Sequence, residues 1–496
     1  MSLQKALKSL SAALLIFMFL TIATVGNADG QAKNFTMEAE QHWETYGVGG
    51  TCIAGTQNLA VADVDDDGMR EMITGGSMYY CDENGSRINQ TAPLKIWTWN
   101  GKNLTLENAY NWFGRIGCLY TADADGNGKT EIITGGSLIN ESGSYPTLRI
   151  WAIDGTALTL KASYEGLTVT AVFVSDIDKD TKPEILTVGK TSGDIEPIAQ
   201  ISIWKYSENT LELWKSVNCG DSTNDSASAI HASDIDGDGN MEILTAGYSG
   251  GITNSSGQLR VWQWDGQTFV LKRNEEWRIV DGYALNVVGN PLGNTMAFNV
   301  KVEDVDSDGV REILAGGFTY DGQNVNGQLR IWNWNGQVLN LEATQEWLTL
   351  DITELKSIAI GDVDGDGTKE IVTSGDTSGY GSWAQNATNK ERAELIVWSH
   401  NGTALTLEHD LNWIIGEGVG AWNCGTGDVD NDGVVEIVTV GCMYIDTLCD
   451  PDLRIWSVPQ SQSLAFYPYL PYVAVGVTAA VIIAGLATFM LVKKKR

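Results

Sequence analysis

The sequence predicts an all-β fold built from repeated four-stranded units, on the strength of three observations. A nine-residue acidic loop of the type Asp-x-Asp-x-Asp-Gly-x-x-Glu recurs seven times along the 496 residues. Its copies begin at residues 63, 123, 176, 234, 304, 362 and 428, so they lie 53 to 70 residues apart. A short apolar phrase ending in Trp, such as Leu94-Lys-Ile-Trp97, follows each loop. A period of about 60 residues with four strand-like runs per repeat predicts a seven-bladed β-propeller.

The sixth repeat shows how each unit is expected to be built. Residues 357–361 alternate in polarity and lead into the acidic loop, and 370–373 leave it, which predicts strands A and B. After a polar connection, 394–398 is expected to form strand C, and an Asn-Gly turn at 401–402 leads to strand D over 405–413. An Asn-Gly pair between two alternating runs is a strong hairpin signal. Each acidic loop should therefore join strands A and B.

The seventh repeat lacks a regular fourth strand, because residues 459–464 are polar and irregular. A matching segment lies near the start of the chain, over 35–43. Its spacing from an apolar phrase to Trp43 equals that from 104–107 to Trp112. We expect 35–43 to be the outer strand of the last blade and to close the ring, which pairs sheet edges that would otherwise stay open.

The acidic loops have the ligand types of a calcium site. Oxygen side chains at positions 1, 3 and 5 and a carboxylate at 9 suit a hard cation of this size, and Gly at 6 permits a sharp turn. An EF-hand would need a Glu at position 12, where these repeats have Thr or Ala. We expect up to seven Ca²⁺ ions that mainly brace the hairpins. The expected ligands are Asp63, Asp65, Asp67 and Glu71; Asp123, Asp125, Asn127 and Glu131; Asp176, Asp178, Asp180 and Glu184; Asp234, Asp236, Asp238 and Glu242; Asp304, Asp306, Asp308 and Glu312; Asp362, Asp364, Asp366 and Glu370; and Asp428, Asp430, Asp432 and Glu436.

Two loops depart from this pattern. Asn127 removes one carboxylate from the second loop, which should weaken that site slightly. Thr181 replaces the turn glycine of the third loop, and a β-branched residue with a positive φ is strained. The third loop is therefore expected to be the weakest of the set.

Both ends of the chain have the composition of targeting segments. Residues 1–28 combine two lysines, an apolar stretch and small residues, which predicts a secretory signal peptide. Residues 473–492 form an uncharged apolar run long enough to span a bilayer as a helix, and the basic tail 493–496 should stay in the cytoplasm. The sequence thus predicts a single-pass surface protein with its propeller over 29–457 outside the cell and a juxtamembrane linker over 458–472.

Seven cysteines are an odd number for an exported protein. Cys442 and Cys449 flank a short connection and are expected to pair, and Cys52 and Cys81 could form a second disulfide within one repeat. At least one other thiol is then free, unless chains cross-link, and burial as a small apolar residue is the alternative for each. Nine Asn-x-Ser/Thr sequons fit a glycoprotein, with chance in an Asn-rich chain as the alternative.

Charge and composition narrow the function. A net charge of −31 argues against a nucleic-acid partner, because phosphate contacts need Lys and Arg. The four histidines are scattered over different repeats without metal-ligand spacing, so the chain is not expected to be an enzyme. The strand-C tryptophans recur at one position of the repeat, which favours packing between blades over sugar stacking.

The acidic hairpins spread over seven sheets resemble the FG-GAP (VCBS-type) repeats of propellers in integrin alpha chains and in prokaryotic surface proteins. The resemblance covers about residues 35–457, with Gly-Gly, as at 75–76, in place of the usual Gly-Ala-Pro phrase. It implies adhesion, or binding of an extracellular glycan or protein ligand. Alternatives are a structural cell-envelope or complex subunit and, less favoured, a calcium-dependent polysaccharide-active enzyme.

The loops opposite the acidic ones are the expected binding surface, because loops on a rigid scaffold usually carry binding. We expect the acidic loops to look toward the bilayer and these loops to look outward. The expected variable loops are 77–93, 137–147, 248–258, 318–328 and 376–394 between strands B and C, and 278–298 between units.

Overall fold

The computed structural model describes residues 35–42, 51–81, 87–191, 197–220, 224–250, 255–279, 284–285, 291–379, 390–415, 418–445 and 448–460. All regular structure in these ranges is β-strand, which confirms the predicted class. None of the described residues belongs to a helix that could cross a membrane. The predicted signal peptide (1–28), membrane helix (473–492) and basic tail (493–496) lie outside the described residues, as does most of the predicted linker.

The strands are β1 (Thr36–His42), β2 (Thr51–Ala62), β3 (Glu71–Cys81), β4 (Arg87–Trp99), β5 (Leu104–Ala122), β6 (Glu131–Asn140), β7 (Gly143–Asp154), β8 (Ala157–Glu165), β9 (Ala171–Ser175), β10 (Glu184–Lys190), β11 (Ala199–Ser207), β12 (Thr210–Asn218), β13 (Ser226–Ser233), β14 (Glu242–Ser249), β15 (Ser256–Trp264), β16 (Phe269–Trp277), β17 (Ala284–Leu285), β18 (Pro291–Gly293), β19 (Thr295–Glu303), β20 (Glu312–Tyr320), β21 (Val325–Trp334), β22 (Leu339–Trp347), β23 (Ile352–Gly361), β24 (Glu370–Ser378), β25 (Arg392–His400), β26 (Leu405–Trp413), β27 (Gly418–Gly427), β28 (Glu436–Ile445) and β29 (Leu448–Ser457).

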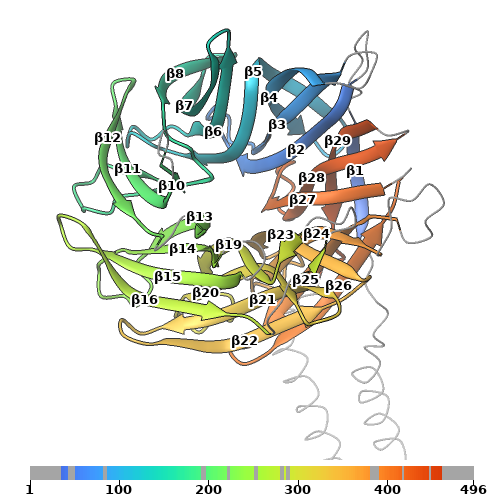
Figure 1. Ribbon diagram of the computed structural model, residues 1–496. Coiled ribbons are helices and arrows are strands. Elements are labelled where there is room, and N and C mark those ends of the chain that lie inside the picture. The colour runs from blue at the N-terminus through green and yellow to red at the C-terminus, as the bar shows by residue number, and fades with distance from the viewer. Residues whose placement is uncertain are drawn as a thin grey trace, which may run out of the picture.

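Antiparallel four-stranded sheets are the building unit, and each unit is named here after the acidic loop that it contains. The third unit has the order β12-β11-β10-β9 and the fourth β13-β14-β15-β16. The 19-residue β5 serves two units, since its first half pairs with β4 and its second half with β6. The sheets of the fifth and sixth units are joined by one parallel bridge, from Val325 to Ile352. Figure 1 shows the units arranged in a ring, so the fold is propeller-like.

The two ends of the described chain meet in one sheet. Its order is β1-β29-β28-β27, and β1 runs antiparallel to β29 from Thr36 opposite Ser457 to His42 opposite Asp452. Phe35 packs edge-on against Trp456, with the ring centroids 6.4 Å apart. Of the segment expected over 35–43, residues 36–42 therefore form the outer strand beside the last strand of the seventh repeat.

A central cavity of about 610 Å³ runs through the ring. It is lined by the innermost strand of every unit, namely β2, β5, β9, β13, β19, β23 and β27. The second strands, which lie inside each sheet, are the most deeply buried. Ile73, Ile133 and Ile243, for example, have no exposed surface. A strand covered on both faces by neighbouring sheets can be apolar on both, which accounts for the unbroken apolar runs after each acidic loop.

The strand-C tryptophans pack between units, as predicted. Four of them lie against a tryptophan from the outer strand of the preceding unit. The ring centroids are 5.3 Å apart for Trp112–Trp151, 5.3 Å for Trp277–Trp332, 5.2 Å for Trp347–Trp398 and 5.0 Å for Trp413–Trp456. Aromatic pairs at this separation add to the energy of area burial.

The same tryptophans also explain position 12 of the repeat. In six units the buried Trp Nε1–H donates to the Thr Oγ1 at that position, over 2.9–3.1 Å. The hydroxyl gives the indole N–H the partner that a buried donor requires. The Thr that rules out an EF-hand thus has a structural role, which the sequence pattern alone did not reveal.

The expected variable loops are shorter than predicted in three units. β3 continues to Cys81 and β4 starts at Arg87, so most of 77–93 is strand. In the second unit only residues 141–142 separate β6 from β7, and in the fifth only 321–324 separate β20 from β21. The prediction of long loops at 77–93, 137–147 and 318–328 is wrong in extent, because backbone pairing continues through polar residues without an alternating pattern.

Candidate metal centres

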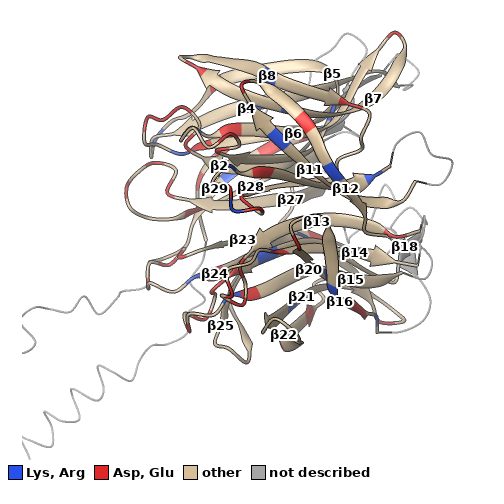
Figure 2. Cartoon of the chain, turned by 90° about the vertical axis from the view of Figure 1, so that its left-hand side faces the viewer, with Lys and Arg blue, Asp and Glu red and all other residues tan. Residues whose placement is uncertain are grey.

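All seven acidic loops join the innermost strand of a unit to its second strand, as predicted. They connect β2 to β3, β5 to β6, β9 to β10, β13 to β14, β19 to β20, β23 to β24 and β27 to β28. In the side view of Figure 2, acidic residues mark hairpin loops at one side of the disc. The loops thus form a ring of acidic hairpins on one face.

Each loop is held by the same frame of backbone hydrogen bonds. The position-9 Glu Oε2 accepts from the N–H of position 2, over 2.8–3.1 Å. The position-1 Asp Oδ2 accepts from the N–H of position 6, over 2.7–3.0 Å. The position-3 Asp accepts from position 5 over 3.0–3.2 Å, and the side chain at position 5 accepts from position 7 over 2.6–2.8 Å. One oxygen of each side chain is fixed in this way.

The turn requires positive φ at two positions. At position 6 the glycines have φ of 86–94°, and Thr181 of the third loop is forced to 75°. Position 4 is also left-handed in every loop, with φ of 61–74° at residues that include Asp66, Lys179 and Ser307. The requirement at position 6 follows from the sequence pattern, whereas that at position 4 does not, because the residue there varies.

The structure brings the predicted ligands together. One oxygen each from Asp63, Asp65 and Glu71 lie within 4.8 Å of one another, and the second to fifth loops contain similar groups of three. The position-9 glutamates are the most buried members, with at most 3% of their surface exposed.

The chemistry of the donor set fits a divalent cation bound by oxygen ligands. Among the described residues, five buried carboxylate oxygens of the loops accept no hydrogen bond: Glu71 Oε1, Glu184 Oε1, Asp234 Oδ1, Asp304 Oδ1 and Asp362 Oδ1. Of these, Glu184 Oε1 has an ion-pair partner, Lys205 Nζ, at 3.1 Å. A buried acceptor without a partner is costly, and an ion at the centre of the cluster would satisfy it.

Burial and repulsion between neighbouring carboxylates disfavour the ionised form of the position-9 glutamates. Desolvation, helped by the neighbouring aspartates, raises the pKa of the position-9 carboxyl to about 7 in six loops. The residues are Glu71, Glu131, Glu242, Glu312, Glu370 and Glu436. A bound cation would favour the ionised form of each.

A further carboxylate from the outer strand stands beside four of the loops. In the first unit Glu107, together with Asp65 and Glu71, lines a cavity of about 310 Å³. Burial, and then the charges of Asp65 and Asp67, raises its pKa. The equivalent residues are Glu342, Glu408 and Glu38, at the loops of the fifth, sixth and seventh units. The recurring Leu-Thr-Leu-Glu phrase was the signal that could have identified them.

The turn between strands C and D of one unit covers the acidic loop of the preceding unit. A Cβ on Gly336 would lie 2.6 Å from Asp236 Oδ2, and one on Gly402 would lie 2.7 Å from Asp306 Oδ2. Gly101 lies in the same way against Asp430, across the seam between the first and seventh units. In these units the turn between strands C and D and the acidic loops therefore lie on the same face.

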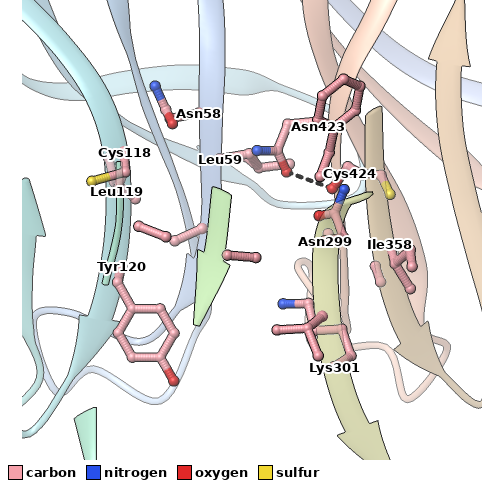
Figure 3. Close-up of a pocket in the computed structure, with 18 of the residues that line it drawn as sticks. Asn58, Leu59, Cys118, Leu119, Tyr120, Asn299, Lys301, Ile358, Asn423 and Cys424 are labelled. Carbon is pink, nitrogen blue, oxygen red and sulfur yellow. Dashed lines mark hydrogen bonds between the residues drawn. The ribbon is translucent and has the colours of Figure 1, made fainter. Parts of the chain in front are cut away.

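The central cavity has a polar lining, and its asparagine side chains form hydrogen bonds within the chain (Figure 3). Asn58, Asn299 and Asn423 each donate to a backbone carbonyl of an adjacent unit, over 3.3, 2.7 and 3.3 Å. These residues join neighbouring units, which is a structural task.

The cysteines are described only in part. Cys442 is disulfide-bonded, while the side chains of Cys52, Cys81 and Cys449 lie outside the described set, so both predicted pairings stay predictions. Cys118 and Cys424 are buried free thiols.

One comparison with known proteins gives a match. Residues 304–373 match the family described as FG-GAP-like repeat. This segment begins at the fifth acidic loop and ends on β24, just after the sixth. No curated protein matches the chain. The resemblance is confirmed to this extent: the chain contains an FG-GAP-like repeat.

Proposed function

We propose that the protein is a seven-bladed, calcium-braced propeller at the cell surface, which binds an extracellular glycan or protein ligand through the face opposite its acidic loops. The single observation that carries the proposal is the common geometry of the loops. Each has a fixed hydrogen-bond frame around converging carboxylates, and in five loops one buried carboxylate oxygen accepts no hydrogen bond from the described residues. Extracellular calcium modules bind at about 10⁻⁴–10⁻³ M, which suits a permanent brace.

The seven-blade assignment is supported by the central cavity. Seven inner strands line it, and each is followed by one acidic loop. Pairing of β1 with β29 supports a closed ring, because no edge is then left between the first and last repeats.

The orientation is supported by the path of the chain after β29. Gln460 Nε2 donates to Val363 O over 3.1 Å, so this residue lies against the sixth acidic loop. Residues that lead toward the predicted membrane segment thus leave on the acidic face, and the B–C connections lie at the other ends of the strands. In the proposal the acidic face looks toward the bilayer and the opposite face is free for a ligand.

Binding, rather than catalysis, is the proposed role, and propellers carry many unrelated functions. The test is binding of the purified full chain to glycan and cell-envelope arrays, with calcium and with chelator. We expect calcium-dependent binding that is lost when the connection between β24 and β25 is shortened. Extending the two-residue turn at 141–142 is the matched control for a loop change. A folded, calcium-loaded sample that binds nothing would instead favour a structural cell-envelope subunit.

A further inference from the structure

The third acidic loop already contains a cation from the chain itself. Lys205 Nζ lies 3.1 Å from Asp178 Oδ2, 3.5 Å from Asp180 Oδ2 and 3.1 Å from Glu184 Oε1. These side chains occupy positions 3, 5 and 9, which would ligate an ion in the other loops. The ammonium group also lies 4.2 Å from the centre of the Trp214 ring, a cation–π distance that adds to its attraction.

The register of the sheet explains how this lysine reaches the loop. In the fourth and fifth units the residue after the strand-C tryptophan lies opposite the position-9 glutamate, as Gln263 does opposite Glu242. Ile185 lies opposite Trp204 in the third unit, so Lys205 falls beside Glu184 in the same way. Neighbours across two strands are close enough for their side chains to interact.

No other unit has a charged residue there. The equivalent residues are Thr98, Ala152, Gln263, Asn333, Ser399 and Ser457. The third loop departs in two further ways, because Thr181 holds a φ of 75° in place of glycine and Trp214 stands where four units have the additional glutamate. Lys205, Thr181 and Trp214 each make the third loop a weaker binding site for a cation than the other loops.

We propose that the third acidic loop takes no calcium, and that the ammonium of Lys205 occupies the cation position and holds the hairpin closed. A lysine ammonium has three N–H donors and one charge, which suits three surrounding carboxylates. Calcium needs six to eight oxygens at about 2.3–2.6 Å, and Lys205 occupies the space between those oxygens. The loop would then stay folded when calcium is withdrawn. The ion count in this inference rests on the proposed function, but the clamp by Lys205 does not.

Calcium stoichiometry of the purified full chain is the first measurement, by calorimetry or equilibrium dialysis. We expect six ions per chain, one fewer than the number of acidic loops. Lys205→Gln should add a seventh ion, and the reverse change Gln263→Lys, beside the fourth loop, should remove one. Gln263 Nε2 lies 3.4 Å from Glu242 Oε1, so a lysine there reaches the equivalent oxygen. Seven ions in the unchanged chain, with no gain in Lys205→Gln, would overturn the inference and leave the proposed function intact.

Hydrogen exchange in chelator is the second measurement and needs no bound ion. The amides of residues 176–184 should be protected about tenfold more than those of the other loops, since charge-assisted hydrogen bonds hold them. Lys205→Gln should abolish this excess, and calcium should restore it. Equal exchange in all loops of the unchanged chain would overturn the clamp. Absence of calcium at every loop would overturn the proposed function, while the exchange data would still decide on Lys205. If Lys205→Gln does not fold, retention of all ions by Gln263→Lys would count against the inference.

Discussion

Replacing one position-9 glutamate by glutamine should stabilise the calcium-free chain and reduce the stabilisation that calcium provides. Glu370 is 1% exposed, and its Oε2 accepts from the N–H of Val363 over 2.9 Å. Glutamine keeps an acceptor for that bond but removes the buried charge. Burial and nearby carboxylates raise the pKa of Glu370 from 4.5 to about 7. Because each pKa unit is worth about 1.4 kcal/mol, Glu370→Gln should stabilise the calcium-free chain at pH 8 by roughly 1–3 kcal/mol.

Calcium should offset that gain in stability. On the proposed function, the ion at the sixth loop stabilises the folded chain by RT ln(1 + [Ca²⁺]/Kd). With a Kd of about 10⁻⁴–10⁻³ M and about 10 mM calcium, this amounts to roughly 1.4–2.7 kcal/mol per site. Glu370→Gln removes a ligand and should forfeit most of it. The advantage of the variant over the parent chain, roughly 1–3 kcal/mol in chelator, should therefore fall by about 1.4–2.7 kcal/mol in calcium.

Thermal and urea unfolding followed by tryptophan fluorescence would measure both effects. The matched control is Glu184→Gln in the third loop. There Lys205 offsets part of the desolvation that raises the pKa of the glutamate, so the substitution should stabilise the chain less than Glu370→Gln does, and equally in calcium and in chelator. The reasoning would be refuted if calcium did not change the stability difference between Glu370→Gln and the parent chain, or if calcium left the stability of the parent chain unchanged.

Four further results are expected. In chelator, ionisation of the position-9 glutamates should make the parent chain less stable at pH 8 than at pH 5. The pKa of these glutamates in the folded chain is about 7, above the ordinary 4.5, so the free-energy penalty of ionising them in the fold is absent below about pH 4.5 and complete above pH 7. Unfolding measured across this pH range checks the prediction. Saturating calcium should flatten the pH dependence. Thr373→Val should cost about 1–3 kcal/mol, because Trp398 Nε1 loses its partner, without altering calcium binding; urea unfolding beside calorimetry tests both parts. Thr181→Gly should stabilise by about 1 kcal/mol by relieving its positive φ, and a loss of stability would contradict the strain argument. Deleting residues 29–43 removes β1 from β29 and should sharply lower the melting temperature, so an unchanged melting curve would disprove closure by this strand.

The parts of the site that could be predicted are those encoded within a few residues. Asp63, Gly68 and Glu71 lie in one hairpin, so their spacing alone indicates the turn and the cluster. Lys205 could not be found in this way, because it follows Glu184 by 21 residues and reaches the loop only through the register of β10 and β11. The partner of Thr74 was missed for the same reason, because Trp97 lies on the next strand. The recurring Leu-Thr-Leu-Glu phrase marks Glu107 as part of the repeat, but its place beside an acidic loop follows from the pairing of β4 with β5. Long-range register, which no local pattern contains, decided each case.

The same register divides the ring of acidic loops into two arcs. In each unit one residue of the outer strand lies opposite the strand-C tryptophan. The next residue along the outer strand is a glutamate in four units, namely Glu38, Glu107, Glu342 and Glu408. These are the fifth, sixth, seventh and first units, which are consecutive across the β1–β29 seam. In the second, third and fourth units the same place holds Lys161, Trp214 and Lys272, and Lys205 adds a further charge.

An arc with an additional carboxylate at each loop attracts a divalent ion more strongly than an arc with lysines, since the Coulomb terms have opposite sign. The strong arc contains the seam, where Gly101 lies against Asp430 and where the two ends of the repeat array meet. Closing a ring between distant chain segments costs loop entropy. If the proposed function is right, calcium would mainly stabilise the seam between the first and seventh units. The arc that contains the lysines would depend least on calcium for its stability.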